Sequence, residues 1–260
     1  MGIRKKFSVL AKVRDTFGFG EVVKLILRKM SLPKIFTQKS INEFPSRLHK
    51  IETVDELESW FKDRSDVEVG WKNLNIEYKR TLDYCSFIQE RNGFFDSAYD
   101  MGELALHAMV GIIYFYGPKK ILETGVAAGK SSAIILSAIA LSKSDAKLVS
   151  TDITEKCGIL IPEVLKVNWD FRLLRGNLRR AFKKIVQNVP ELDMFIHDSN
   201  HSIKWENFEV ETVFKNCPKV RFVLVDDVHP SICEQFNQDT WDLALLMEPG
   251  KLTLLAVMKN

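Results

Sequence analysis

The sequence predicts an α/β fold, in which a doubly wound, mostly parallel sheet of seven strands follows a helical N-terminal extension. From residue 120 onward, short apolar runs alternate with longer segments of helical periodicity, as in parallel sheets covered by helices on both faces. The first apolar run leads into a glycine-containing turn before a helix. The last two runs, residues 243–247 and 252–257, flank Pro249 and Gly250 and therefore predict a hairpin that closes the sheet.

Five parallel strands are expected before this hairpin, each at an apolar run of ordinary strand length. We place them at residues 120–123, 147–151, 171–174, 192–196 and 220–225. The segments between them have helical periodicity. We expect helices at residues 130–142 and 178–187, a third one after residue 201 through residue 214, and a short helical turn at residues 162–167.

The N-terminal part of the chain is expected to be mostly helical. A capping box, in which a threonine and a glutamate satisfy free N–H groups at a helix start, is predicted at residues 53–56. Residues 100–114 form the clearest helix ahead of the sheet, and Gly117 ends it. We therefore divide the chain into a helical extension or cap, residues 1–90, and a second domain, residues 91–260.

Charge is distributed unevenly along the chain. The net charge is +3, yet residues 1–40 carry ten Lys or Arg against two acids, which leaves −5 for the other 220 residues. A basic segment with interleaved apolar residues is typical of a helical cap or dimer arm, or of contact with an anionic membrane surface. We favour the cap or dimer arm and keep membrane-surface contact as the alternative. No nucleic-acid-binding module is recognisable, so nucleic acid is not an expected partner.

The apolar runs and the cysteine spacing also indicate the cellular compartment of the protein. No apolar run reaches the roughly 18 residues that a membrane-spanning helix needs, and basic residues interrupt every apolar stretch where a signal peptide would lie. The four cysteines are scattered without Cys-x-x-Cys spacing and are interpreted as reduced thiols. We expect a cytoplasmic protein, with the basic N-terminus as the feature that would bring it to a membrane surface.

The most informative stretch is residues 121–132. The acidic Glu123 ends the apolar strand, and Gly125 and Gly129 follow at a spacing of four before the helical segment. Glycine suits these positions because a β-carbon would obstruct either the turn or the approach of a ligand to the backbone. A strand, a glycine turn and a helix N-terminus together place backbone N–H groups where a ligand can bind.

This stretch resembles the first motif of the class I S-adenosylmethionine-dependent methyltransferases, an acidic residue followed by Gly-x-Gly-x-Gly or a relaxed Gly-x-x-x-Gly. The resemblance covers roughly residues 95–260 and implies a Rossmann-like sheet of five parallel strands, a sixth strand and an antiparallel seventh. It also implies S-adenosylmethionine as the cofactor. The residues expected to hold it are Glu123, Thr124, Gly125, Gly129, Ser131, Asp152, Asn177 and Asp198.

Two of these residues stand where strands are expected to end. Asp152 follows the second strand, where a carboxylate accepts hydrogen bonds from both ribose hydroxyls in folds of this kind. Asn177 follows the third strand, where the family often has an aspartate near the adenine, and its amide could bond the adenine edge. The alternative for both is that the side chain caps the next helix.

A phosphate-binding loop is another interpretation of the same stretch. Gly129, Lys130 and Ser131 resemble the end of the motif Gly-x-x-x-x-Gly-Lys-Ser/Thr, and residues 221–227 resemble the magnesium-binding strand of such NTPases. The spacing argues against it, because the motif needs a glycine where this chain has Thr124. A glycine turn that binds no ligand is the third interpretation.

Residues 197–202, His-Asp-Ser-Asn-His-Ser, and the later pair Asp226 and Asp227 resemble a narrower group. These are the metal-dependent O-methyltransferases of the macrocin and aminocoumarin sugar type, with Asp-x-Asp-His-Ser after strand four and Asp-Asp after strand five. The resemblance implies that Asp198, Asp226 and Asp227 hold Mg²⁺, which prefers oxygen ligands. It implies a small-molecule acceptor, a hydroxyl of a sugar or secondary metabolite.

The sequence departs from this pattern at Asn200, which stands where the group has the aspartate proposed as general base. An amide cannot accept a proton at neutral pH. His201 is the candidate base, because histidine titrates near neutral pH, but it could equally brace the following helix. Four alternatives remain for the missing base. His229 takes the proton, or the metal alone suffices. Otherwise the protein catalyses another reaction, or it binds S-adenosylmethionine without catalysis.

Overall fold

The computed structural model describes residues 41–63, 75–76, 78–85 and 100–259. The basic segment at residues 1–40 therefore lies outside the described residues, and so does the region around the expected domain boundary at residue 90. None of the described helices has the length and the apolar composition of a membrane-spanning segment.

A single sheet forms the centre of the protein, and its five parallel strands confirm the predicted fold class. In spatial order they are β4 (Trp169–Leu173), β3 (Lys147–Asp152), β2 (Lys120–Thr124), β5 (Met194–His197) and β6 (Phe222–Val225). The predicted hairpin consists of β7 (Trp241–Glu248) and β8 (Lys251–Met258). β8 lies between β6 and β7 and runs antiparallel to both.

Within the described part of the chain the sheet has eight strands, one more than expected. β1 (His49–Ile51) pairs in parallel with the edge strand β7, and Ile51 is fully buried. This part of the extension was expected to be helical. The expectation was wrong because a three-residue strand is too short to show the alternation of apolar and polar residues that marks a strand. The partition of the chain into residues 1–90 and 91–260 stays a prediction.

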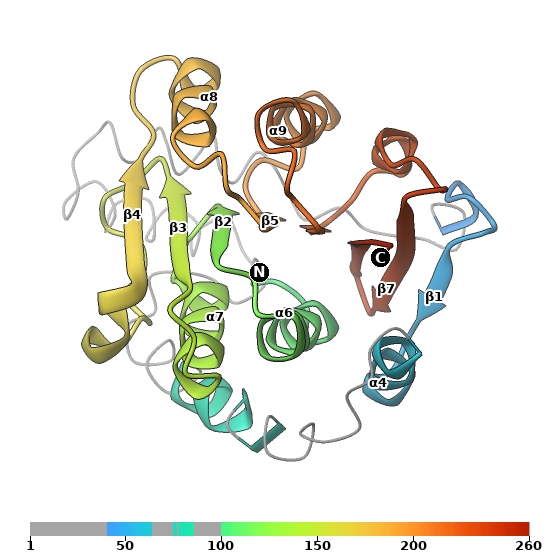
Figure 1. The fold of residues 1–260 in the computed structure, drawn as a ribbon, viewed down its shortest axis with the longest axis horizontal. Helices are drawn as coiled ribbons and strands as arrows, with labels where there is room; N and C mark the ends of the chain where they lie inside the picture. The colour runs from blue at the N-terminus through green and yellow to red at the C-terminus, as the bar shows by residue number, and fades with distance from the viewer. Residues whose placement is uncertain (1–40, 64–74, 77, 86–99, 260) are drawn as a thin grey trace, which may run out of the picture.

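Helices cover both faces of the sheet (Figure 1). One face carries α4 (Val54–Lys62), α6 (Glu103–Tyr116) and α7 (Lys130–Leu141). The other face carries α8 (Leu178–Gln187), α9 (Ile203–Asn216) and the 3₁₀ helix η3 (Pro230–Gln235). The short helical turn expected after β3 is the 3₁₀ helix η2 (Glu163–Asn168).

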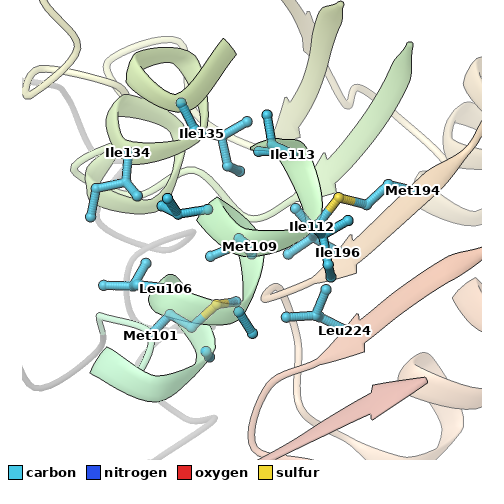
Figure 2. Close-up of a cluster of buried hydrophobic side chains, with 14 of the residues drawn as sticks. Met101, Leu106, Met109, Ile112, Ile113, Ile134, Ile135, Met194, Ile196 and Leu224 are labelled. Carbon is cyan, nitrogen blue, oxygen red and sulfur yellow. The ribbon is translucent and has the colours of Figure 1, made fainter. Parts of the chain in front are cut away.

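The core is divided between these two faces because successive strand residues point in opposite directions. Ile121 of β2 packs on the side of α6 and α7, whereas its neighbour Leu122 packs on the side of α8 and α9. Figure 2 shows Met109 and Ile112 of α6 beside Ile196 of β5. Each fully buried side chain of this size contributes roughly 1.5–3 kcal/mol to folding.

The start of α4 confirms the predicted capping box. Oγ1 of Thr53 accepts a hydrogen bond from the backbone N–H of Glu56 at 3.2 Å, and the Glu56 carboxylate accepts one from the Thr53 N–H at 3.2 Å. The helix start is therefore specified by four consecutive residues. It needs no contact from elsewhere in the chain.

Candidate functional site

Polar side chains gather where the central strands end. β2 ends at Thr124, β3 at Asp152 and β5 at His197, and Asp226 follows the last residue of β6. Parallel strands place these carboxyl ends at one edge of the sheet, which is where ligands bind in open α/β folds. The structure thus brings the strand-end residues predicted from the sequence to a common edge.

The glycine loop between β2 and α7 is tightly enclosed by other backbone. Gly125 and Gly129 have φ values of 84° and 91°. A β-carbon on Gly125 would lie 1.9 Å from the carbonyl oxygen of Asp198, and one on Gly129 would lie 2.7 Å from Cα of Gly158. The two glycines therefore allow the connections after β5 and β3 to pack directly against the loop.

Asp152 braces this loop from the end of β3. Its Oδ2 accepts hydrogen bonds from the backbone N–H groups of Val126 and Ala127, at 2.9 and 3.1 Å. Its Oδ1 accepts one from the N–H of Thr154 at 3.1 Å. The residue is 3% exposed. The carboxylate that was expected to bind a ribose thus also satisfies two N–H groups of the glycine loop.

Glu123 is fully buried and accepts hydrogen bonds from three serine hydroxyls. The donors are Ser131 at 2.6 Å, Ser132 at 2.5 Å and Ser150 at 2.7 Å. Burial raises the pKa of the Glu123 carboxyl, and the three hydrogen bonds oppose that rise. Glu123 and Ser131, both expected to contact the cofactor, therefore bond each other and tie β2 to α7.

A second buried carboxylate, Glu209 of α9, was missed from the sequence. Its Oε2 accepts a hydrogen bond from Oγ1 of Thr124 at 2.8 Å and lies 2.6 Å from Nδ1 of His197. Its Oε1 accepts one from Nε1 of Trp205 at 2.7 Å. No motif marks this residue, and its one sequence signal is a glutamate on the buried face of a helix. Glu209 holds the ends of β2 and β5 together.

Asp198, His201 and Asp226 form a cluster beyond β5 and β6. One potential metal-binding atom from each lies within 4.8 Å of the other two. Nδ1 of His201 lies 3.2 Å from the backbone carbonyl oxygen of Asp226, so Nδ1 carries the proton and donates it. Nε2 is then the nitrogen with the lone pair, and it lies 3.6 Å from Oδ1 of Asp198.

The two carboxyl groups of this cluster are buried close together, which disfavours their charged forms. Burial raises the pKa of Asp198 well above its ordinary value, and the negative charge of Asp226 raises it further. Burial also raises the pKa of Asp226, while Lys251 and a 2.6 Å hydrogen bond from Thr253 oppose the rise. A cation at this position would relieve the repulsion between the two carboxylates.

Three other expected site residues have local contacts. Asp227 is buried with φ at 47°, and among the described residues it belongs to no cluster of metal-binding atoms. Oδ1 of Asn200 accepts a hydrogen bond from the N–H of Ser202 at 3.0 Å, just before α9. Asn177 caps α8 by accepting one from the N–H of Arg180 at 3.1 Å, which is the capping alternative considered for it.

Comparison with known proteins agrees with this arrangement. Residues 122–228 match a family model described as a methyltransferase domain. A putative O-methyltransferase from Klebsiella pneumoniae has a similar structure, with a TM-score of 0.53 and 12% identity over 71% of this chain and 90% of that chain. A methyltransferase from Geobacter sulfurreducens has a TM-score of 0.50 and 8% identity over 81% of this chain and 98% of that chain. No curated protein sequence matches.

The sheet order and the glycine loop give the chain the fold of the class I methyltransferases. The segment from the third residue of β2 to the loop after β6 matches the model of a methyltransferase domain. The resemblance inferred from residues 121–132 is thereby confirmed.

Proposed function

We propose that the protein transfers the methyl group of S-adenosylmethionine to a hydroxyl of a small-molecule acceptor, beside a bound Mg²⁺ ion. One observation carries the proposal. The glycine loop and the cluster of Asp198, His201 and Asp226 are in direct contact, because Gly125 packs against the backbone of Asp198. A cofactor held by the loop and an acceptor held at the cluster would therefore be neighbours.

The residues expected to hold the cofactor keep that role in the proposal. Gly125 and Gly129 provide the backbone path of the loop, and Asp152 would bind the ribose hydroxyls while it braces the loop. Glu123 supports the loop indirectly, because its carboxylate accepts hydrogen bonds from Ser131 and Ser132 at the start of α7.

The acceptor hydroxyl has to lose its proton as its oxygen bonds to the methyl carbon. Asp198, Asp226 and Asp227 would hold Mg²⁺, which would lower the pKa of a hydroxyl bound to it. Nε2 of His201 would take the proton, because Nδ1 is already committed as a donor to the Asp226 carbonyl. The oxygen–carbon bond would form as the carbon–sulfur bond breaks, and the sulfur would keep that electron pair and leave as S-adenosylhomocysteine.

The class of acceptor rests on the resemblance of residues 197–202 and of Asp226 and Asp227 to the sugar O-methyltransferases. An O-methyltransferase among the structures of similar fold supports methyl transfer to oxygen. We propose that residues 1–90 form a cap that shapes the acceptor side. We also propose that the protein is cytoplasmic. Dimer formation or membrane-surface contact through residues 1–40 also belongs to the proposal.

The phosphate-loop interpretation fits the contacts less well. The N–H groups of Val126 and Ala127, which a phosphate would need, donate to Asp152, and a carboxylate there would repel a phosphate. Nζ of Lys130 lies 3.4 Å from Oδ2 of Asp100, and the two side chains are 17% and 9% exposed. The lysine is therefore engaged in an ion pair, whereas in an NTPase it would have to contact the phosphates of the nucleoside triphosphate.

Calorimetric titration with S-adenosylhomocysteine and, separately, with ATP tests the proposal, each with and without Mg²⁺. We expect binding of S-adenosylhomocysteine in the low micromolar range, no binding of ATP, and little change in the Lys130→Ala variant. Binding of ATP with Mg²⁺ that is lost in Lys130→Ala would refute the proposal in favour of an NTPase.

A second experiment separates an enzyme from a non-catalytic cofactor-binding protein. Asn200→Asp restores the carboxylate of the sugar O-methyltransferase pattern and can still accept the hydrogen bond from Ser202. Asn237→Asp is the matched control, because Asn237 is exposed and accepts the same kind of bond from the N–H two residues ahead. We expect faster methyl transfer to a panel of hydroxyl acceptors in Asn200→Asp alone. No transfer by either variant would favour the non-catalytic protein.

A further inference from the structure

We propose that His197, His201 and Glu206 form a binding site for a zinc-class divalent cation, distinct from the three carboxylates assigned to Mg²⁺. One potential ligand atom from each of the three residues lies within 4.8 Å of the others. His197 and Glu206 are fully buried, and His201 is partly buried. Metal binding here does not depend on methyl transfer, but a cation held by Nε2 of His201 would exclude that nitrogen as the proton acceptor of the proposed function.

The state of His197 is the main observation. Nδ1 of its ring lies 2.6 Å from Oε2 of Glu209, and an ionised carboxylate can only accept, so Nδ1 carries the proton. Nε2 then has a lone pair. This nitrogen is buried and has no hydrogen-bond partner among the described residues. Buried polar atoms are nearly always paired, so an exception of this kind calls for a ligand that supplies the missing partner.

Glu209 completes an arrangement that is characteristic of metal-binding histidines. Such histidines usually donate their second ring N–H to a carboxylate, which fixes the ring and the protonated nitrogen. Glu209 is itself held in place by hydrogen bonds from Thr124 at 2.8 Å and from Trp205 at 2.7 Å. Nε2 of His197 is therefore held in one direction before any ion binds.

The other two ligands are oriented in a similar way. Nδ1 of His201 donates to the Asp226 carbonyl, which leaves Nε2 with its lone pair. Oε2 of Glu206 accepts a hydrogen bond from the backbone N–H of His229 at 3.1 Å. The rings of His197 and His201 lie perpendicular, with centroids 5.7 Å apart. The protein thus anchors both side chains close to Nε2 of His197.

The donor atoms decide which cation fits. Imidazole nitrogens suit zinc and its neighbours in the first transition series, whereas Mg²⁺ prefers oxygen ligands only. Two histidines and one carboxylate are the number and kind of ligands found in catalytic zinc sites, which keep a fourth position for water. Bonds of about 2.1 Å place tetrahedral ligand atoms about 3.4 Å apart.

The test uses the full chain, stripped of metal with a chelator and titrated with Co²⁺. Cobalt in a tetrahedral site with nitrogen ligands gives intense visible absorption bands. We expect these bands to saturate at one equivalent, to disappear when Zn²⁺ is added, and to persist in a large excess of Mg²⁺. Absence of the bands, or their loss on addition of Mg²⁺, would overturn the proposal.

Two variants localise the site without removing the anchoring bonds. His197→Asn keeps an amide N–H that can donate to Glu209, and His201→Asn keeps one for the Asp226 carbonyl, but both lack Nε2. We expect each to bind Co²⁺ roughly 10–100-fold more weakly. His49→Asn, at an exposed position on β1, should bind it as the unchanged protein does. Equal affinity in all three variants would overturn the proposal.

A variant that retains the fold is available if a histidine variant does not fold. Glu206→Gln keeps the volume of the side chain and an oxygen that can accept from His229. It should weaken Co²⁺ binding at least tenfold, and unchanged affinity in this folded variant would refute the site. A protein that binds S-adenosylhomocysteine but no Co²⁺ contradicts this inference alone. One that binds Co²⁺ but no S-adenosylhomocysteine contradicts the proposed function alone.

Discussion

Nδ1 of His197 lies 2.6 Å from Oε2 of Glu209, and both side chains are completely shielded from solvent. Through this contact α9 holds the end of β5. The same carboxylate oxygen accepts a hydrogen bond from Thr124 at the end of β2. One residue of a covering helix therefore sets the positions of two strand ends, from which the glycine loop and the segment with Asp198 and His201 continue.

Replacing the Glu209 carboxylate should lower the free energy of unfolding. Glu209→Gln replaces the charged acceptor of the His197 and Thr124 hydrogen bonds by a neutral amide, and a hydrogen bond to a charged group contributes about 1.5–3 kcal/mol. Urea unfolding should show this loss in the free energy of unfolding. Glu211→Gln changes an exposed glutamate of the same helix and should stay within about 0.5 kcal/mol of the unchanged protein. Equal unfolding midpoints in the two variants would show that Glu209 does not stabilise the site.

The glycine loop should not tolerate a side chain at its first glycine. In Gly125→Ala the new β-carbon would lie 1.9 Å from the Asp198 carbonyl oxygen, so the connection after β5 has to move. We expect destabilisation by about 3 kcal/mol, from overpacking and from the unfavourable φ together, and loss of S-adenosylhomocysteine binding.

Gly117→Ala is the matched control for this change. Gly117 also has positive φ, at 56°, but a β-carbon there would meet nothing within 4 Å. It should cost only about 1 kcal/mol and leave S-adenosylhomocysteine binding intact, as calorimetry would show. Similar affinities for both alanine variants would mean that the path of the loop does not matter for the cofactor.

Asp152 is expected to act on both the loop and the cofactor. Asp152→Asn weakens the hydrogen bonds to Val126 and Ala127, which should lower the free energy of unfolding by about 1–3 kcal/mol. If it also binds the ribose, calorimetry should show affinity for S-adenosylhomocysteine reduced by about tenfold, the equivalent of one charge-assisted hydrogen bond. Asp170→Asn, at an exposed position of β4, should change neither quantity. Loss of stability without loss of affinity would assign Asp152 to the loop alone.

The cysteines should differ in reactivity, and the order should depend on pH. Burial raises the pKa of the Cys85, Cys217 and Cys233 thiols to about 11. The thiolate is the reactive form, so these three should be alkylated slowly at pH 8 and faster as the pH approaches 11. Cys157 is less buried and should react first.

Mass spectrometry of peptides after iodoacetamide treatment measures this order. The residue after Cys157 packs against Gly129 of the glycine loop, so S-adenosylhomocysteine bound there should slow the reaction of Cys157. Alkylation of all four cysteines at one rate at pH 8 would contradict the raised pKa values of the buried thiols.

Local signals explain which parts of the fold were predictable. The bounds of α8, Leu178–Gln187, agree with the prediction because its apolar residues recur with helical periodicity and Asn177 caps its start. The capping box of α4 is equally local. β1 was missed because it is held by pairing with β7, almost two hundred residues further along the chain.

The candidate site was predictable only as a set of positions. The sequence by itself determined the alternation of strands and helices, the glycine loop, and the acids and histidines that follow particular strands. The tertiary structure decided which of these groups meet. It turned Asp152 toward the loop N–H groups and brought His201 close to both Asp198 and Asp226. It also brought Glu209 to His197. Hydrophobic periodicity and glycine dihedral angles act over a few neighbouring residues, whereas these contacts depend on strand register and on the packing of α9 against the sheet.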